Sequence, residues 1–172
     1  MIYDKSEAAQ AFLDEWQSDS PDVLAHTSGS TGEPKLMKLS KKDMCLSAEA
    51  TCSFFNINSK SHLLLPLSVD YIAGKMMIVR SIVSGADLTI VNPCSNPFDG
   101  VDMLCGIDLV AIVPAQIPAL ISASQNIDFK HVIVGGAPVS QSQQKMLIDS
   151  GIDAWVTYGM TETGSHVALR HI

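Results

Sequence analysis

Short apolar stretches alternate with helical patterns along the whole chain, and this alternation limits the possible folds more than any other feature. Apolar stretches with the length of strands lie at residues 23–26, 36–39, 62–67, 86–91, 109–113, 131–134 and 154–157. Helical patterns lie at residues 5–17, 41–55, 71–84, 99–105 and 114–123, and from the N-cap Ser140 to residue 149. Such alternation predicts an α/β fold, with sheets of mostly parallel strands and helices on both faces.

The segment between the first two predicted strands has the composition of a loop that binds phosphate groups. Glycine backbone, hydroxyls and an ammonium group together supply the donors that a polyphosphate needs. The spacing differs from the Walker A loop, in which the lysine directly follows the second glycine. A flexible surface loop is the alternative, but Lys38, Lys41 and Lys42 close by favour phosphate binding. The loop residues concerned are Thr27, Ser28, Gly29, Ser30, Thr31, Gly32 and Lys35.

Composition and charge exclude several classes of protein. The chain has 172 residues, a formal net charge of −7 and a pI of about 5.0, which argue against non-specific binding to nucleic acids. It has neither an apolar run of the ~20 residues that a membrane span needs nor the pattern of a signal peptide. Cys45, Cys52, Cys94 and Cys105 lack the spacing of a metal site. We therefore expect a cytoplasmic protein with free thiols and small-molecule partners.

Two further motifs follow predicted strands, at the end of the sheet where ligands of α/β proteins bind. Gly135, Gly136, Ala137 and Pro138 come directly after the strand at residues 131–134. After the last strand, an aromatic ring, a hydroxyl and a carboxylate come from Tyr158, Gly159, Met160, Thr161 and Glu162. A carboxylate beside a phosphate loop suits Mg²⁺, although alone this motif favours a simple turn with a solvated glutamate. We expect one crevice to collect all three motifs.

In this order the three motifs resemble those of the adenylate-forming superfamily. That superfamily contains acyl- and aryl-CoA ligases, luciferases and the adenylation domains of peptide synthetases. The resemblance implies a reaction in two steps. ATP and a carboxylic acid form an acyl-adenylate and pyrophosphate, and a thiol, usually coenzyme A, then displaces AMP. The cofactors implied are ATP and Mg²⁺, with coenzyme A as co-substrate.

The resemblance also implies a role for each motif. The loop ending at Lys35 holds the β- and γ-phosphates, residues 135–138 line the nucleotide and acyl pocket, and Tyr158 packs on adenine. Thr161 contacts phosphate and Glu162 holds Mg²⁺, so Lys35, Thr161 and Glu162 form the implied catalytic set. Neutralisation of charge by the metal and the loop donors lets the carboxylate attack the α-phosphate.

Residues 71–80 and 163–170 are most similar to the o-succinylbenzoate–CoA ligases of menaquinone synthesis. That substrate has a second carboxylate, so its pocket needs a cation or several donors. Lys75, on an otherwise apolar helix, is the first candidate, with Tyr71 and His166 beside it. The alternative for Lys75 is that its ammonium group reaches the surface. We expect Arg80 to be structural.

The resemblance covers residues from about 23 to 170, whereas the superfamily continues further, with a ribose-binding aspartate, a hinge and a small C-terminal domain. We therefore expect residues 1–172 to be part of an N-terminal domain that is inactive alone. Two other interpretations remain open. One is another aryl- or acyl-CoA ligase, such as one for a benzoate. The other is a non-catalytic module that binds nucleotides.

Overall fold

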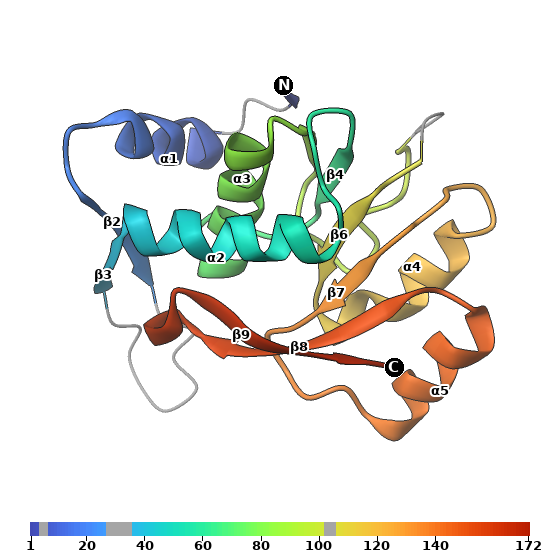
Figure 1. The fold of residues 1–172 in the computed structure, drawn as a ribbon. Coiled ribbons are helices and arrows are strands. Elements are labelled where there is room, and N and C mark those ends of the chain that lie inside the picture. Colours follow the sequence, from blue (N-terminus) through green and yellow to red (C-terminus); the bar gives the residue numbers. More distant parts are fainter. Residues whose placement is uncertain (4–6, 27–35, 102–105) are drawn as a thin grey trace.

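The computed structural model describes residues 1–3, 7–26, 36–101 and 106–172, and within these ranges it contains a central seven-stranded sheet (Figure 1). Neighbouring strands are parallel except for the last pair, β8 and β9. This arrangement confirms the predicted α/β fold with a mostly parallel sheet. The strands in sheet order are β1 (Ile2–Tyr3), β5 (Asp87–Ile90), β4 (His62–Leu65), β6 (Leu109–Ile112), β7 (Val132–Val134), β8 (Ala154–Met160) and β9 (Ser165–His171).

Helices cover both faces of this sheet, as the alternation predicts (Figure 1). One face packs against α1 (Glu7–Gln17), α2 (Lys41–Phe54) and α3 (Ile72–Ser84). The other face packs against α4 (Ile117–Ala123) and α5 (Gln141–Ser150). Successive side chains of a strand point to opposite faces, so Leu63 and Leu65 of β4 enter the first hydrophobic cluster and Leu64 enters the second.

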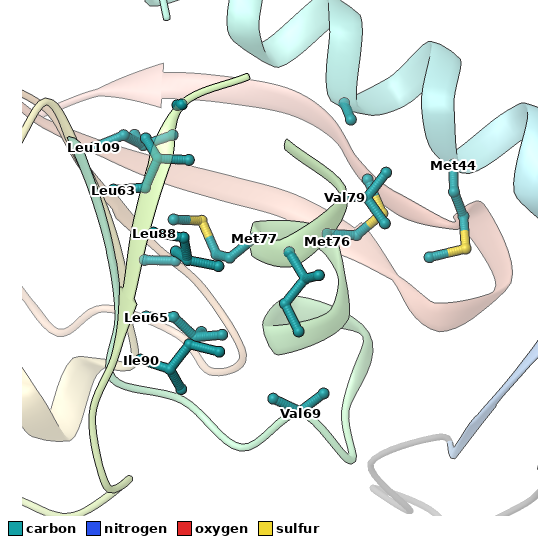
Figure 2. Packing of buried hydrophobic residues seen from close by; sticks show 14 of the residues in the cluster. Met44, Leu63, Leu65, Val69, Met76, Met77, Val79, Leu88, Ile90 and Leu109 are labelled. Carbon is teal, nitrogen blue, oxygen red and sulfur yellow. The ribbon is translucent and has the colours of Figure 1, made fainter. Parts of the chain in front are cut away.

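Helix α3 lies between the sheet and α2, where a helix that is apolar on nearly every side is expected. Met76 and Met77 are fully buried, and Figure 2 shows Met77 beside Leu88 of the sheet. Met44 of α2 closes the cluster from the other side (Figure 2). No helix within the described ranges, α3 included, has both the length and the apolar character to cross a membrane.

Two predicted helix starts are confirmed by their side-chain caps. The Ser40 hydroxyl accepts a hydrogen bond from the backbone N–H of Asp43 at the start of α2. At the start of α5, the Ser140 hydroxyl accepts from the N–H of Gln143, and the Gln143 side chain accepts from the N–H of Ser140. This second, reciprocal pair satisfies two backbone donors that a helix start otherwise leaves open.

Residues 23–26 and 36–39 form strands, as predicted. Strands β2 (Asp22–His26) and β3 (Leu36–Ser40) pair with each other as a separate antiparallel sheet. The predicted helix at residues 99–105 is wrong at its start: Asp99 and Gly100 form a turn, because Gly100 has a φ of 72°, outside the helical region. Residues 102–105 lie outside the described residues.

The ends of two strands also differ from the prediction. Strand β4 ends at Leu65 rather than residue 67, since Pro66 has no N–H for a further sheet hydrogen bond. Strand β8 continues to Met160, three residues beyond the predicted end at Thr157, because β9 pairs along it. Neither β9 nor the two-residue β1 was predicted as a strand.

Candidate functional site

A cavity of about 1240 Å³ opens at the carboxyl ends of the parallel strands, as expected for this class of fold. Its walls come from the segments that follow β4, β5, β6, β7 and β8, and from α3 and the start of β9. Residues 135–138 and residues 158–162 both line it. The structure therefore brings two of the three predicted motifs together in one crevice. The third, residues 27–35, lies outside the described residues, although its neighbours His26 and Met37 line the same cavity.

The glycine motif after β7 presents main chain to the cavity. The N–H of Gly135 donates to the carbonyl of Ile112, which continues the β6–β7 pairing by one residue. Gly136 then takes a φ of 79°, a conformation that favours glycine, with Val113 close to the place where a Cβ would lie. The chain turns here, and residues 136–138 are exposed at the cavity.

The second motif lies at the end of β8 and in the one-turn helix η2 (Thr161–Thr163). Tyr158 is 69% exposed, so its ring is accessible for stacking. Thr161 is buried and Glu162 is exposed at the cavity. Among the described residues no cluster of three or more metal-ligating side chains occurs. A single carboxylate suits Mg²⁺ that arrives with a nucleotide, since Mg²⁺ is usually held by one or two carboxylates plus substrate phosphates.

Gly159 is required by the way β9 folds back on β8. A Cβ at residue 159 would overlap the β9 backbone, 2.5 Å from His166 Cα and 2.9 Å from His166 N. The pairing register also shifts between Tyr158 and Gly159. This close approach brings Ser165 and His166 of β9 to the cavity wall beside α3.

Arg80 of α3 is the charged side chain that the structure places at this wall. It is only 2% exposed, and its Nη2 donates to Ser165 Oγ at 3.1 Å and to His166 Nδ1 at 3.4 Å. Its Nε has no hydrogen-bond partner within the described part of the chain, and none of the ion pairs found there includes it. Burial lowers the pKa of Arg80 to about 10, so it remains a cation at neutral pH. A buried, unpaired charge at a cavity wall favours an anionic ligand.

Lys75 does not line the cavity. Its ammonium group lies over the Phe12 ring of α1, 4.5 Å from the ring centroid, and burial lowers its pKa. The reason is the rotation of the helix: Ile72, Met76 and Arg80 share the face that lines the cavity, whereas Lys75 points about a third of a turn away. Tyr71 and His166, the two residues expected beside Lys75, do line the cavity.

Gln116 is a site residue that sequence reasoning missed. It is buried, and its amide nitrogen donates to the carbonyls of Pro66 at 3.0 Å and Cys94 at 2.9 Å. Its amide oxygen accepts from the N–H of Val113 at 3.1 Å. Gln116 thereby joins the segments that follow β4, β5 and β6, all of which line the cavity. A single glutamine in the sequence carries no signal for this role.

Comparison with known proteins agrees with this geometry. A family model for AMP-binding enzymes matches residues 3–172, almost the whole chain. The chain belongs to the AMP-binding enzyme family. The superfamily resemblance seen in the sequence is thus confirmed. Among curated relatives, the 2-succinylbenzoate–CoA ligase of Salmonella typhimurium is 29% identical over 166 residues, which is 96% of this chain and 35% of that protein.

Solved structures of AMP-binding enzymes share the fold. The acyl-CoA synthetase (AMP-forming)/AMP-acid ligase II-like protein from Dyadobacter fermentans is 34% identical, with a TM-score of 0.84 over 95% of this chain and 48% of its own. O-succinylbenzoate coenzyme A synthetase from Bacillus subtilis, in complex with ATP and a magnesium ion, has a TM-score of 0.77 over 90% of this chain and 33% of its own. At 20% identity, the second likeness concerns the fold alone. The chain spans about a third of the length of the first curated relatives it matches, 35% and 34%.

Proposed function

We propose that this chain forms the nucleotide- and acid-binding part of an adenylate-forming acid–CoA ligase. We further propose that its acid is an aromatic acid with a second carboxylate, of the o-succinylbenzoate type. The observation that carries the proposal is the buried Arg80, whose Nε has no partner among the described residues and whose side chain lies on the wall of a mostly apolar cavity in an AMP-binding fold. An aromatic acid without a second anionic group gives such a cation no partner, so its desolvation would remain uncompensated.

The nucleotide side of the cavity is assigned to the sequence motifs. Tyr158 stacks on the adenine, and the backbone at Gly136 lets the base approach. Thr161 and the loop at residues 27–35 contact the phosphates, and Lys35 adds a positive charge. The flanks of that loop, His26 and Met37, line the cavity, which supports this assignment.

Glu162 is the residue that we expect to hold Mg²⁺ together with the nucleotide phosphates. The metal supplies charge neutralisation at the phosphates. The chain itself binds and orients the two reactants, so that the acid carboxylate lies in line with the α-phosphate. Attack there forms the acyl-adenylate and releases pyrophosphate. Because the curated relatives are named CoA ligases, we propose that the thiol of coenzyme A finally accepts the acyl group. We assign no described residue to coenzyme A.

The test compares stable analogues of o-succinylbenzoyl-adenylate and benzoyl-adenylate by calorimetric titration of the chain. We expect the first to bind at least about tenfold more tightly, as one charge-assisted hydrogen bond provides. The Arg80→Met variant should lose this difference. The Lys75→Met variant is the matched control, because it removes a cation from the same helix outside the cavity, and it should retain the difference.

Other outcomes would contradict the proposal in different ways. Loss of the difference in Lys75→Met but not in Arg80→Met would move the acid site to Lys75. Equal binding of both analogues by the unsubstituted chain would favour a benzoate-type ligase. Binding of ATP that is unchanged in Glu162→Gln, with no binding of either adenylate, would favour a non-catalytic nucleotide-binding module.

A further inference from the structure

His166 contacts two helices from its place at the start of β9. Its Nδ1 faces Nη2 of Arg80 on α3 at 3.4 Å, and its Nε2 faces the hydroxyl of Thr51 on α2 at 3.3 Å. The Thr51 hydroxyl itself donates to the backbone carbonyl of Ser47 at 3.0 Å. The imidazole therefore lies between two groups whose hydrogen-bonding roles are already determined.

Only one tautomer of His166 satisfies both neighbours. A hydroxyl has a single proton, and Thr51 uses it toward Ser47, so Thr51 can only accept from His166. Arginine has no acceptor, so it can only donate to His166. The ring must therefore carry its proton on Nε2 and accept at Nδ1.

The charge of the surroundings agrees with a neutral ring. Burial, and next the positive charge of Arg80, lower the pKa of His166 to about 4. A protonated ring would turn a second N–H donor toward the guanidinium group, with repulsion between like charges. Ser165, the neighbouring residue on β9, adds a second acceptor for the same Nη2 at 3.1 Å.

We propose that His166 is a positioning residue for Arg80: the neutral imidazole, held by Thr51, fixes the guanidinium at the cavity wall, where it meets the second carboxylate of the acid. This proposal rests on the proposed function, because it assigns the acid to Arg80. It changes the expected role of His166 from a direct substrate contact to support of the residue that makes the contact. Two experiments test it, one of which needs no ligand.

The first experiment determines the tautomer of His166 in the free chain at neutral pH. Long-range ¹H–¹⁵N spectra of chain labelled in histidine distinguish the two neutral tautomers from each other and from the imidazolium, and His166→Gln identifies the signal. We expect the Nε2–H tautomer, and in Thr51→Val a shift of that signal. The Nδ1–H tautomer or an imidazolium would overturn the proposal, whatever the chain binds.

The second experiment measures the two adenylate analogues with substitutions at residue 166. Removal of the acceptor in His166→Leu should weaken binding of the o-succinylbenzoyl analogue by about tenfold or more, and that of the benzoyl analogue by less than about threefold. The amide of His166→Gln can accept from Arg80 and donate to Thr51, so it should restore most of the affinity. Thr51→Ser, which keeps the hydroxyl, should bind as the unsubstituted chain does.

A matched control is available in His62, whose Nε2 lies 3.0 Å from the hydroxyl of Thr89, away from the cavity. His62→Leu removes a similar histidine–threonine contact and should leave the ratio of the two affinities unchanged. An equal loss for both analogues in His166→Leu, or no loss for either, would overturn the proposal. Failure of the unsubstituted chain to prefer the o-succinylbenzoyl analogue would instead count against the proposed function, while the tautomer still decides the orientation of His166.

Discussion

Lys75 and Arg80 show how differently two cations on one apolar helix are accommodated. Lys75 keeps its ammonium group over the face of the Phe12 ring, where the ring quadrupole offsets part of the cost of burial. Arg80 instead has neutral hydrogen-bond partners, Ser165 and His166, and a buried Nε without a partner among the described residues. Neutral partners hold a guanidinium group in place without cancelling its charge. That combination suits a residue that must still attract an anion.

The histidine beside Arg80 makes stability depend on pH. The pKa of His166 falls from its ordinary value of 6.5 to about 4 on folding, because of burial first and the Arg80 charge second. Between these two values the unfolded chain binds a proton that the folded chain does not, so stability falls as pH falls from about 6.5 to about 4. The stabilising contribution is complete above about pH 6.5.

We therefore expect the melting temperature of the unsubstituted chain to fall more steeply than that of His166→Gln over this acidic range. Calorimetry of both proteins at constant ionic strength checks this expectation. The carboxylates titrate in both proteins, so the difference between the two curves isolates His166. Parallel curves would show that His166 does not have a lowered pKa.

At the scale of elements, the β8–β9 pair forms one wall of the cavity. Its two strands carry the aromatic ring of Tyr158 and the acceptors of Ser165 and His166, and the bend between them holds Glu162. This arrangement depends on Gly159, where the strands approach too closely for any Cβ. The backbone of β9, unlike the end of a flexible side chain, cannot move aside locally.

Gly159→Ala should therefore lower the free energy of unfolding by about 1–3 kcal/mol, the usual cost of overpacking. It should also change the His166 tautomer signal, since His166 lies directly against the added methyl group. Chemical denaturation measures the first effect. Val167→Ala, at a residue of the same strand that is 62% exposed, is the control. It should change stability by less than about 0.5 kcal/mol, and a similar loss in both variants would contradict the close approach.

At the scale of the whole molecule, the sheet joins two hydrophobic clusters that lie on its opposite faces. Alternate residues of one strand belong to different clusters, as Leu63 and Leu64 do, so neither cluster can unfold while the sheet remains. We expect a single cooperative transition. The cavity lies at the carboxyl ends of the strands of this shared sheet, so its walls depend on both clusters.

Leu120→Ala tests this cooperativity, because Leu120 is fully buried in the cluster beneath α4. Its removal should cost about 2–5 kcal/mol. In a Trp155→Phe background the fluorescence of Trp16, which packs on the opposite cluster, should report the same loss as circular dichroism. A Trp16 transition that Leu120→Ala leaves unchanged would mean that the two faces unfold separately.

The sequence alone determined the fold class and the two described motifs of the site, because both depend on local patterns. Alternating apolar and helical segments indicate a parallel sheet, and residues that follow its strands lie together at the carboxyl ends of those strands. Hence residues 135–138 and 158–162 were correctly expected in one crevice. The caps Ser40 and Ser140 were also predictable, since a cap acts within its own turn.

Only the tertiary structure decided which cation faces the cavity and what holds it. Helix α3 is apolar nearly all round, so its sequence does not reveal its rotation, and a third of a turn exchanges Lys75 for Arg80. Ser165 and His166 reach Arg80 only because β9 returns antiparallel along β8, and Gln116 joins three segments that are distant in sequence. Such contacts arise from the packing of whole elements, and no local pattern records them.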